Sequence, residues 1–257
     1  MTGFVTAVSA TFTREVARSR HRWVLTYLVP VFPPIVAVTL FADLMSPAEN
    51  LPGFPASTYQ DYVAASAVLL PGMMAAGLTA SSAGADLRSG LADRLRVLGV
   101  SAAATTCGRL LFEGLRILPA AVAAYLAAVL LGDDVAWRAD AMLVLLLLAV
   151  AWAIAYNGIF HAFAAITGSA HAPIALQPLF APLTFLSIFW FPRTLMPAWG
   201  ATVTDYNPIS WLTDAGLATT IGGVAPAEVL AGVGTVLIVG AAGLVATVRI
   251  LERRAAR

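Results

Sequence analysis

The charged side chains that could do chemistry gather in one short segment of this sequence. The segment reads Asp86-Leu-Arg-Ser-Gly-Leu-Ala-Asp-Arg-Leu-Arg96 and lies between two long apolar stretches. Residues 62–85 carry no charge, and residues 110–131 carry only Glu113 and Arg116. Because so many charges are too costly to bury in hydrocarbon, we expect the segment to lie at a membrane surface. There its chemistry would be ionic contact with a soluble partner.

The sequence lacks the common catalytic and metal-binding patterns. It has no Gly-x-Ser-x-Gly and no His-Glu-x-x-His, and no carboxylate accompanies His161 or His171. We therefore expect a chain that is not an enzyme and holds no metal, with His161 and Asn157 hydrogen-bonding to neighbouring helices. Cys107 is the single cysteine, which excludes an internal disulfide and is typical of a small buried side chain. A reactive thiol is the alternative.

The basic residues exclude one way of using ATP. All fifteen Lys and Arg positions are arginine, whereas the phosphate-binding loop of ATPases needs a lysine that reaches the nucleotide phosphates. If ATP drives this protein, a separate chain must bind the ATP and its Mg²⁺. We expect no cofactor on this chain and no nucleic-acid partner.

The composition predicts an all-α polytopic membrane protein. The chain is 60% hydrophobic and 11% charged, with a mean hydropathy of +0.83. Soluble domains are about half apolar and about a quarter charged. Six stretches are apolar and long enough to cross about 30 Å of hydrocarbon. These predicted spans are about 23–42, 62–85, 110–131, 141–166, 173–191 and 227–250.

Residues 1–22 predict an amphipathic helix in the plane of the membrane interface. Apolar residues recur at three- and four-residue spacing on one side, and arginines recur at the same spacing on another. The apolar positions are Phe4, Val5, Val8, Phe12 and Val16, and the basic ones are Arg14, Arg18 and Arg22. About twenty residues precede the first long apolar run, which argues against a cleavable signal peptide. A simple basic anchor and a helix that also contacts a partner are both open.

The distribution of arginines predicts the orientation. Six spans place both termini on one side, and that side carries twelve arginines against two on the other. The twelve are Arg14, Arg18, Arg20, Arg22, Arg88, Arg94, Arg96, Arg109, Arg249, Arg253, Arg254 and Arg257. The other side carries Arg138 and Arg193 with Asp43, Glu49, Asp61, Asp133, Asp134, Asp140, Asp205 and Asp214. By the positive-inside rule, both termini and the 86–109 connector are cytoplasmic. Arginine-only basicity and abundant alanine are typical of a GC-rich bacterial genome, so we expect the membrane to be a bacterial plasma membrane.

Three motifs resemble a known family of membrane proteins. The first is Asp86–Arg96, continued by Leu98-Gly-Val-Ser101 and Gly108-Arg109-Leu110. The second, and the most specific, is Phe191-Pro-Arg-Thr-Leu-Met-Pro197, then Trp199, then Asn207-Pro-Ile-Ser-Trp-Leu-Thr-Asp-Ala215. The third is Asp61-Tyr62 followed by Leu70-Pro71-Gly72. Together they resemble the ABC-2 type transporter permeases, which include daunorubicin-resistance and nodulation exporters, over roughly residues 10–250. One departure is Gly216-Leu217, where the family often has an arginine.

The resemblance implies a half-transporter. Two permeases, identical or homologous, would lie above two ATP-binding-cassette ATPase subunits, and the 86–109 connector would contain the coupling helix. The leucines can act as apolar anchors while the charged residues form a polar rim that steers association. The anchors are Leu87, Leu91, Leu95 and Leu98, and the rim is Asp86, Arg88, Asp93, Arg94 and Arg96. A solvated cytoplasmic loop is the alternative.

A second charged group lies at the start of the third predicted span. Arg109, Glu113 and Arg116 lie at i, i+4 and i+7, which places them on one helix face. A structural ion pair is one interpretation. The other is that the group relays movement of the coupling helix into the span.

Residues 192–226 predict an outer segment rich in aromatic residues and proline. An aromatic belt suits the membrane interface, and the apolar content suits a re-entrant hairpin broken at Pro197 and Pro208. The expected external turn comprises Pro197, Asn207, Pro208, Trp211 and Asp214. An outer gate and a packed lid are both open.

These features predict a membrane permease subunit of an ATP-driven exporter for a hydrophobic drug, lipid or related amphipathic compound, in contact with membrane lipids. Guesses for the substrate path are Met73, Met74, Phe180, Phe185 and Phe189. An ion-coupled secondary transporter is the alternative. Such transporters place a charge near the bilayer midplane, and the first, second, fourth, fifth and sixth predicted spans have none there.

Overall fold

The structure is a computed structural model that describes residues 3–74, 76–133, 135, 137–222 and 226–255. Thr2 in the predicted N-terminal helix, and Asp134 and Arg257 in the charge count, lie outside the described residues. Within the described ranges the chain is helical throughout, without a strand. The predicted all-α class is therefore confirmed.

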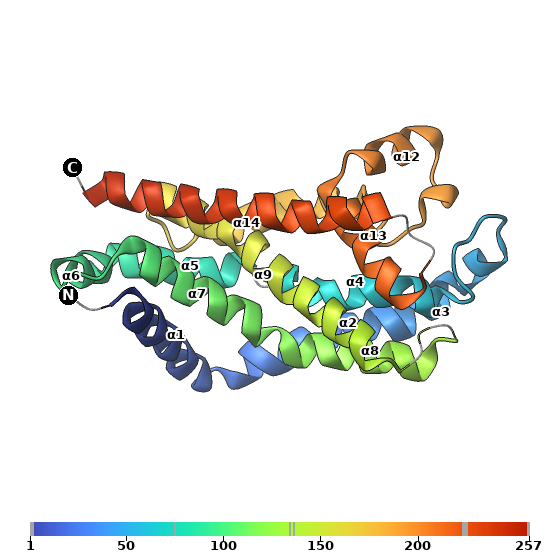
Figure 1. The fold of residues 1–257 in the computed structure, drawn as a ribbon, viewed down its shortest axis with the longest axis horizontal. Helices are drawn as coiled ribbons and strands as arrows, with labels where there is room; N and C mark the ends of the chain where they lie inside the picture. The colour runs from blue at the N-terminus through green and yellow to red at the C-terminus, as the bar shows by residue number, and fades with distance from the viewer. Residues whose placement is uncertain (1–2, 75, 134, 136, 223–225, 256–257) are drawn as a thin grey trace.

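The helices form an elongated bundle with two distinct ends (Figure 1). One end, called the terminal end below, holds α1 (Phe4–Arg20), α6 (Leu91–Val97) and the last turns of α14 (Pro226–Ala255). The opposite end, called the distal end, holds α3 (Ala42–Met45) and α12 (Ala198–Asp205). The charged connector and the two ends of the chain thus lie together.

Among the described residues, five helical segments are long and apolar enough to cross a membrane. They are Val24–Asn50, Tyr59–Arg88, Ala102–Leu131, Ala139–Thr167 and Pro226–Arg254. The first continues past its predicted end at residue 42, and the third begins eight residues before its predicted start at residue 110. Hydropathy locates the apolar part of each helix, whereas the helices themselves continue into polar turns outside the hydrocarbon.

The first span is irregular because of its prolines. It combines η1 (Val24–Leu28), η2 (Val29–Val31), α2 (Phe32–Val36), η3 (Ala37–Phe41), α3 and η4 (Ser46–Asn50). η1 and η3 are π-helical, whereas η2 and η4 are 3₁₀. Pro30, Pro33 and Pro34 cannot donate backbone hydrogen bonds, so the ladder shifts register around them.

The fifth predicted span, 173–191, is not confirmed as a long helix. It consists of α10 (Ala172–Leu176), η5 (Gln177–Phe180) and α11 (Ala181–Phe185), followed by turns. Proline lies at the first or second position of each piece, so none can extend backwards as a regular helix. The predicted count of six long spans is therefore not confirmed: the described residues contain five long spans and one shorter apolar helical segment, Ala172–Phe185.

That shorter segment nevertheless runs the length of the second span. At the terminal end, the backbone of Ser169 lies against Gly84. In the middle, Gln177 bonds to Gly77, and at the distal end the hydroxyl of Tyr62 donates to the carbonyl of Ile188. The two segments are antiparallel neighbours from one end of the bundle to the other.

The second span is the buried centre of the bundle. It comprises α4 (Tyr59–Met74) and α5 (Ala76–Arg88), on either side of residue 75, and Pro71 lies inside α4. Gln177 Nε2 donates to the carbonyl of Met74 (2.5 Å) and also lies 3.4 Å from that of Met73. Its Oε1 accepts from Gly77 N–H (3.2 Å). Since hydrocarbon offers no hydrogen-bond partners, this amide and the backbone of the second span satisfy each other's polar groups.

Small residues allow the remaining helices to approach closely. α9 (Ala139–Thr167) packs against α14 at Gly158 and Gly243, where a Cβ built on Gly243 would lie 2.8 Å from the carbonyl carbon of Gly158. Close backbone approach of this kind replaces hydrophobic driving force between helices in lipid.

The outer segment folds as two short helices. η6 (Arg193–Leu195) leads to α12, and Asn207 joins α12 to α13 (Pro208–Thr220). Asn207 Oδ1 accepts from Ile209 N–H (2.9 Å), and its Nδ2 donates to the carbonyls of Leu183 and Leu186 (2.7 and 2.9 Å). Pro197 and Pro208 sit at helix starts, where a missing donor is tolerated.

We predict that Gln177→Leu destabilises the fold. Leucine fills a similar space but loses the amide's hydrogen bonds to Gly77 N–H and to the Met74 carbonyl at the middle of the second span, which should lower the free energy of unfolding by about 2 kcal/mol. The measurement is unfolding in detergent micelles titrated with dodecyl sulfate. Gln60→Leu, at an exposed bond to Asp43, is the matched control and should change little. Equal effects of the two substitutions would contradict the assigned role of Gln177.

Candidate functional site

The charged connector is helical rather than an open loop. α5 continues to Arg88, the chain turns at Gly90 with φ +70°, and α6 follows. A second turn leads to Ser101, whose hydroxyl accepts from Ala104 N–H (3.1 Å) and caps α7 (Ala102–Arg116). The connector therefore presents one short helix, α6, between two tight turns at the terminal end.

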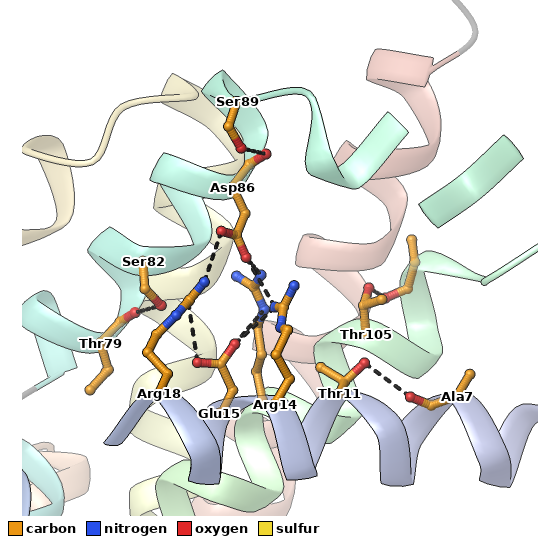
Figure 2. Close-up of polar contacts among 12 residues, drawn as sticks. Ala7, Thr11, Arg14, Glu15, Arg18, Thr79, Ser82, Asp86, Ser89 and Thr105 are labelled. Carbon is orange, nitrogen blue, oxygen red and sulfur yellow. Dashed lines mark hydrogen bonds and ion pairs between the residues drawn. The ribbon is translucent and has the colours of Figure 1, made fainter. Parts of the chain in front are cut away.

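Asp86 is the centre of an ionic cluster at this end (Figure 2). Its Oδ2 lies 3.0 Å from Arg14 Nη2, and its Oδ1 lies 3.2 Å from Arg18 Nη2, both on α1. Arg109 of α7 also donates to Oδ2 through Nη2. Asp86 is only 7% exposed, so three arginines from two helices compensate one buried carboxylate on α5.

Glu15 is the second acid of the cluster, and it was missed in the sequence. Its carboxylate lies 2.9 Å from Arg14 Nη2, 3.3 Å from Arg18 Nη1 and 3.8 Å from Arg109 Nε. Glu15 is buried although it lies on a basic helix. Its position as the one acid of residues 1–22, one residue after Arg14 and three before Arg18, was an available signal. These five side chains are called the arginine–carboxylate cluster below.

α1 packs on α7 through small and polar residues together with part of the predicted apolar stripe. Ala7, Thr11, Glu15 and Ser19 recur every fourth residue and are buried. Of the stripe, Phe4 and Val5 are exposed, whereas the Phe12 ring packs edge-on against Phe112 of α7 at a centroid distance of 6.2 Å. Gly108 permits this approach, because a Cβ there would lie 2.6 Å from the carbonyl oxygen of Val8. α1 is thus docked on the bundle by polar and apolar contacts.

The structure corrects the predicted faces of the connector. Asp86 is not part of an exposed rim, because it is buried in the cluster. Leu87, Leu91 and Leu95 are half-buried and line a cavity inside the chain instead of pointing outward. Arg88, Asp93, Arg94 and Arg96 are exposed, as expected of a rim. The apolar residues that do point outward are Val97 and Leu98, which are 88% and 72% exposed.

The predicted group Arg109, Glu113 and Arg116 divides into two parts. Arg109 belongs to the arginine–carboxylate cluster. Glu113 and Arg116 form their own buried pair, with 2.5 Å between Arg116 Nε and Glu113 Oε2. Glu113 lies within hydrogen-bonding reach of the Thr79 hydroxyl, which lies 2.9 Å from Asn157 Oδ1 and can donate its single hydrogen to one of these two acceptors, so the pair borders the second and fourth spans. Both charges are neutralised within the bundle.

The five guesses for a substrate path do not line one cavity. Met73 and Phe189 are buried, and Phe180 packs against Tyr156 and Phe160 at ring-centroid distances of 5.7 and 5.3 Å. Met74 and Phe185 are exposed. Phe185 lines an apolar pocket of about 230 Å³ at the distal end, together with residues of the outer segment that include Met196 and Trp199.

The predicted external turn is held together by an arginine. Arg193 Nε lies 2.9 Å from Asp205, and its Nη2 lies 3.5 Å from Asp214. Trp211 Nε1 donates to the carbonyl of Asp205 (2.9 Å), which ties α13 to α12. Burial raises the pKa of Asp214 to about 6, although Arg193 acts in the opposite direction. The family motif contains Arg193, but its pairing with Asp214 was not predicted.

Comparison with known proteins adds two findings. The sequence profile described as ABC-2 type transporter matches residues 6–221. The chain is also 31% identical over 224 residues to a Streptomyces coeruleorubidus protein named daunorubicin resistance ABC transporter permease protein DrrB1. That alignment covers 80% of this chain and 72% of the relative. The matched region includes the cluster, the connector and the outer segment.

We predict that Asp86→Asn loosens α1 from the bundle. Removing the charge leaves Arg14, Arg18 and Arg109 close together with Glu15 as their remaining acid, which should cost about 2 to 3 kcal/mol of unfolding free energy. Dodecyl sulfate titration and protease cleavage within α1 measure the effect. Asp93→Asn, an exposed change in the same connector, should leave the unfolding free energy and the protease resistance of α1 unchanged. Unchanged protease resistance of α1 in Asp86→Asn would refute this role.

We predict that Asp214→Asn gains stability relative to the natural protein as pH rises. A carboxyl whose pKa is raised to about 6 in the folded state stabilises the fold when protonated and loses that contribution as pH rises through 6. The apparent melting temperature of the variant, minus that of the natural protein, should therefore increase between pH 4.5 and pH 7. A difference that stays constant over this range would show that Asp214 titrates normally.

Proposed function

Because this chain belongs to the ABC-2 type transporter family, we propose that it is the permease subunit of an exporter driven by separate ATP-binding-cassette ATPase chains. The observation that carries the proposal is α6, a short helix that projects charged and apolar side chains from the terminal end. In this account the permease carries out no chemistry. It converts closure of the ATPase into movement of its own helices.

The surface of α6 suits a protein partner. Val97 and Leu98 are apolar side chains exposed at its C-terminal tip, beside the exposed Arg94 and Arg96. Apolar anchors surrounded by charges match the core and rim of a protein interface. Arg94 and Arg96 have no ion pair within the described part of the chain, so they are available to acidic groups of the ATPase.

The arginine–carboxylate cluster connects the helices on both sides of α6 to α1, so it can transmit a movement of α6. α5 and α7 flank α6 in the chain, and both are tied to α1 through Asp86 and Arg109. A displacement of α6 would therefore act on the second span, the third span and α1 together. These contacts favour α1 as part of the moving unit over α1 as a simple membrane anchor.

We also propose how the chain is oriented in the membrane. The terminal end would face the cytoplasm of a bacterium, in keeping with the arginine count, and segment 172–191 would complete a sixth crossing along the second span. The α12–α13 hairpin would then lie at the outer surface, where the clasp of Arg193 on Asp205 and Asp214 closes it.

A second permease, identical or homologous, would cover the outermost helices. Only 22% of the most apolar window is buried in each of the first and last spans, against 82% in the second. These two spans would therefore face lipid or a partner permease. The cargo would be a hydrophobic or amphipathic compound, since the relative's name associates it with daunorubicin resistance and the distal pocket is apolar.

The test is co-purification of an ATP-binding-cassette ATPase encoded beside this chain. We expect Arg94→Glu/Arg96→Glu to lose the ATPase and ATP-dependent transport while keeping its melting temperature, because both side chains are exposed. Arg249→Glu/Arg253→Glu makes the same charge change on exposed residues of α14 rather than on α6, at the same end of the bundle, and should retain the ATPase. Transport by the purified permease alone, driven by a proton gradient, would overturn the proposal.

A further inference from the structure

A cavity of about 320 Å³ lies inside the terminal end, beneath α6. Its walls come from α5, α6, α7, α9 and α14. The leucines of the connector, which the sequence suggested as outward anchors, form its apolar side: Leu87, Leu91 and Leu95 all line it. The volume is in the range of small-molecule sites.

The cavity has a charged mouth and a buried floor. Asp93, Arg96 and Glu252 line it and are exposed, so the mouth faces the water and headgroups at the terminal end. Thr106 and His161 line it and are each 3% exposed, so they form its floor. A ligand would therefore enter from the aqueous side rather than through the lipid.

His161 offers the floor a hydrogen-bond acceptor. Its Nδ1 lies 2.9 Å from the carbonyl oxygen of Asn157. Because a carbonyl can only accept, Nδ1 carries the hydrogen, and Nε2 of the neutral ring is left as an acceptor. Within the described residues Nε2 has no hydrogen-bond partner. It also differs from the unpaired polar atoms that the protein encloses completely, because part of its surface is accessible. Since His161 lines the cavity, this accessible nitrogen borders it.

Thr106 is a second polar group without a partner on the floor. Its hydroxyl makes no hydrogen bond to any described residue, although the residue is almost entirely buried. Like His161 Nε2, this hydroxyl is not among the unpaired polar atoms that the protein encloses completely, so it is accessible from the cavity that the residue lines. Two buried polar groups of different helices thus border one cavity, and both lack partners in the protein.

The charges around the cavity favour an uncharged ligand. The cavity is lined by three acids, Asp86, Asp93 and Glu252, and by three arginines, Arg96, Arg109 and Arg254. Because these charges balance, the wall favours neither an anionic nor a cationic ligand. Asp86 is already compensated by the arginine–carboxylate cluster.

We propose that this cavity binds a small, uncharged, amphipathic molecule that donates a hydroxyl or amide hydrogen to His161 Nε2. Thr106 completes the polar contact, and the apolar body of the ligand lies against Leu91 and Leu95. Because these leucines belong to α6, an occupied cavity holds α6 in place from behind. The site goes beyond the proposed function, since binding requires neither an ATPase nor transport, and it is separate from the distal pocket.

Cysteine protection in the full chain tests the site directly. In a Cys107→Ser background, Ala165→Cys places a thiol on the cavity wall and Leu98→Cys places one on the outer surface of the connector. The probe is 4-phenylphenol, compared with its methyl ether, which has the same apolar body without the donor. The rate of modification by methyl methanethiosulfonate is measured in detergent against probe concentration.

We expect saturable protection of Ala165→Cys by 4-phenylphenol, with an affinity about three- to tenfold above that of the ether, as one hydrogen bond provides. Leu98→Cys should be unaffected, and His161→Phe should remove the difference between phenol and ether. Size-exclusion profiles and melting temperatures establish that each variant is folded. Thr106→Val is a second, milder variant and should reduce the difference in affinity between phenol and ether. Equal protection by phenol and ether, protection that survives His161→Phe unchanged, or no protection at all would overturn the proposal.

Discussion

A carboxylate that is removed from water must be compensated by positive charge, and at the terminal end this constraint falls on Asp86. Arg14 and Arg18 reach it from α1, and Arg109 reaches it from α7. The same arginines also surround Glu15, so neither acid can be separated from the cluster without exposing unpaired charge. The position of α1 therefore depends on electrostatics in addition to the packing of Phe12 on Phe112, and Gly108 provides the space that lets α1 reach the carboxylate.

This arrangement connects the parts that the proposed function requires to move together. α6 projects Val97 and Leu98 outward, while its leucines face a cavity on the other side. The helices on both sides of α6 carry Asp86 and Arg109, so displacement of α6 acts on the second and third spans at once. At the distal end, Arg193 joins η6, α12 and α13 in a smaller cluster. Between the two ends, Gln177 and Asn157 hydrogen-bond to backbone groups of the second span.

Much of the architecture could be predicted because hydrocarbon imposes simple rules on the sequence. Apolar length located five spans, and the family motifs located the connector and the outer turn. Asp86 was predicted as exposed because a sequence pattern assigns charge to solvent, whereas burial of an acid depends on arginines that lie 68 and 72 residues away. The direction of Leu91 and Leu95 likewise depends on the turn at Gly90, which hydrophobic spacing cannot specify. The fifth predicted span is not a regular helix because Pro173, Pro178 and Pro182 interrupt it.

The central claim is that α1 and the two helices flanking α6 are energetically one unit through Asp86. A double-mutant cycle of Asp86→Asn and Arg109→Gln, with unfolding free energies measured in dodecyl sulfate-titrated micelles, tests this claim most directly. We predict a coupling energy of about 1 kcal/mol or more between the two positions. Additive effects that agree within about 0.3 kcal/mol would contradict it, because they would show that the two side chains act independently.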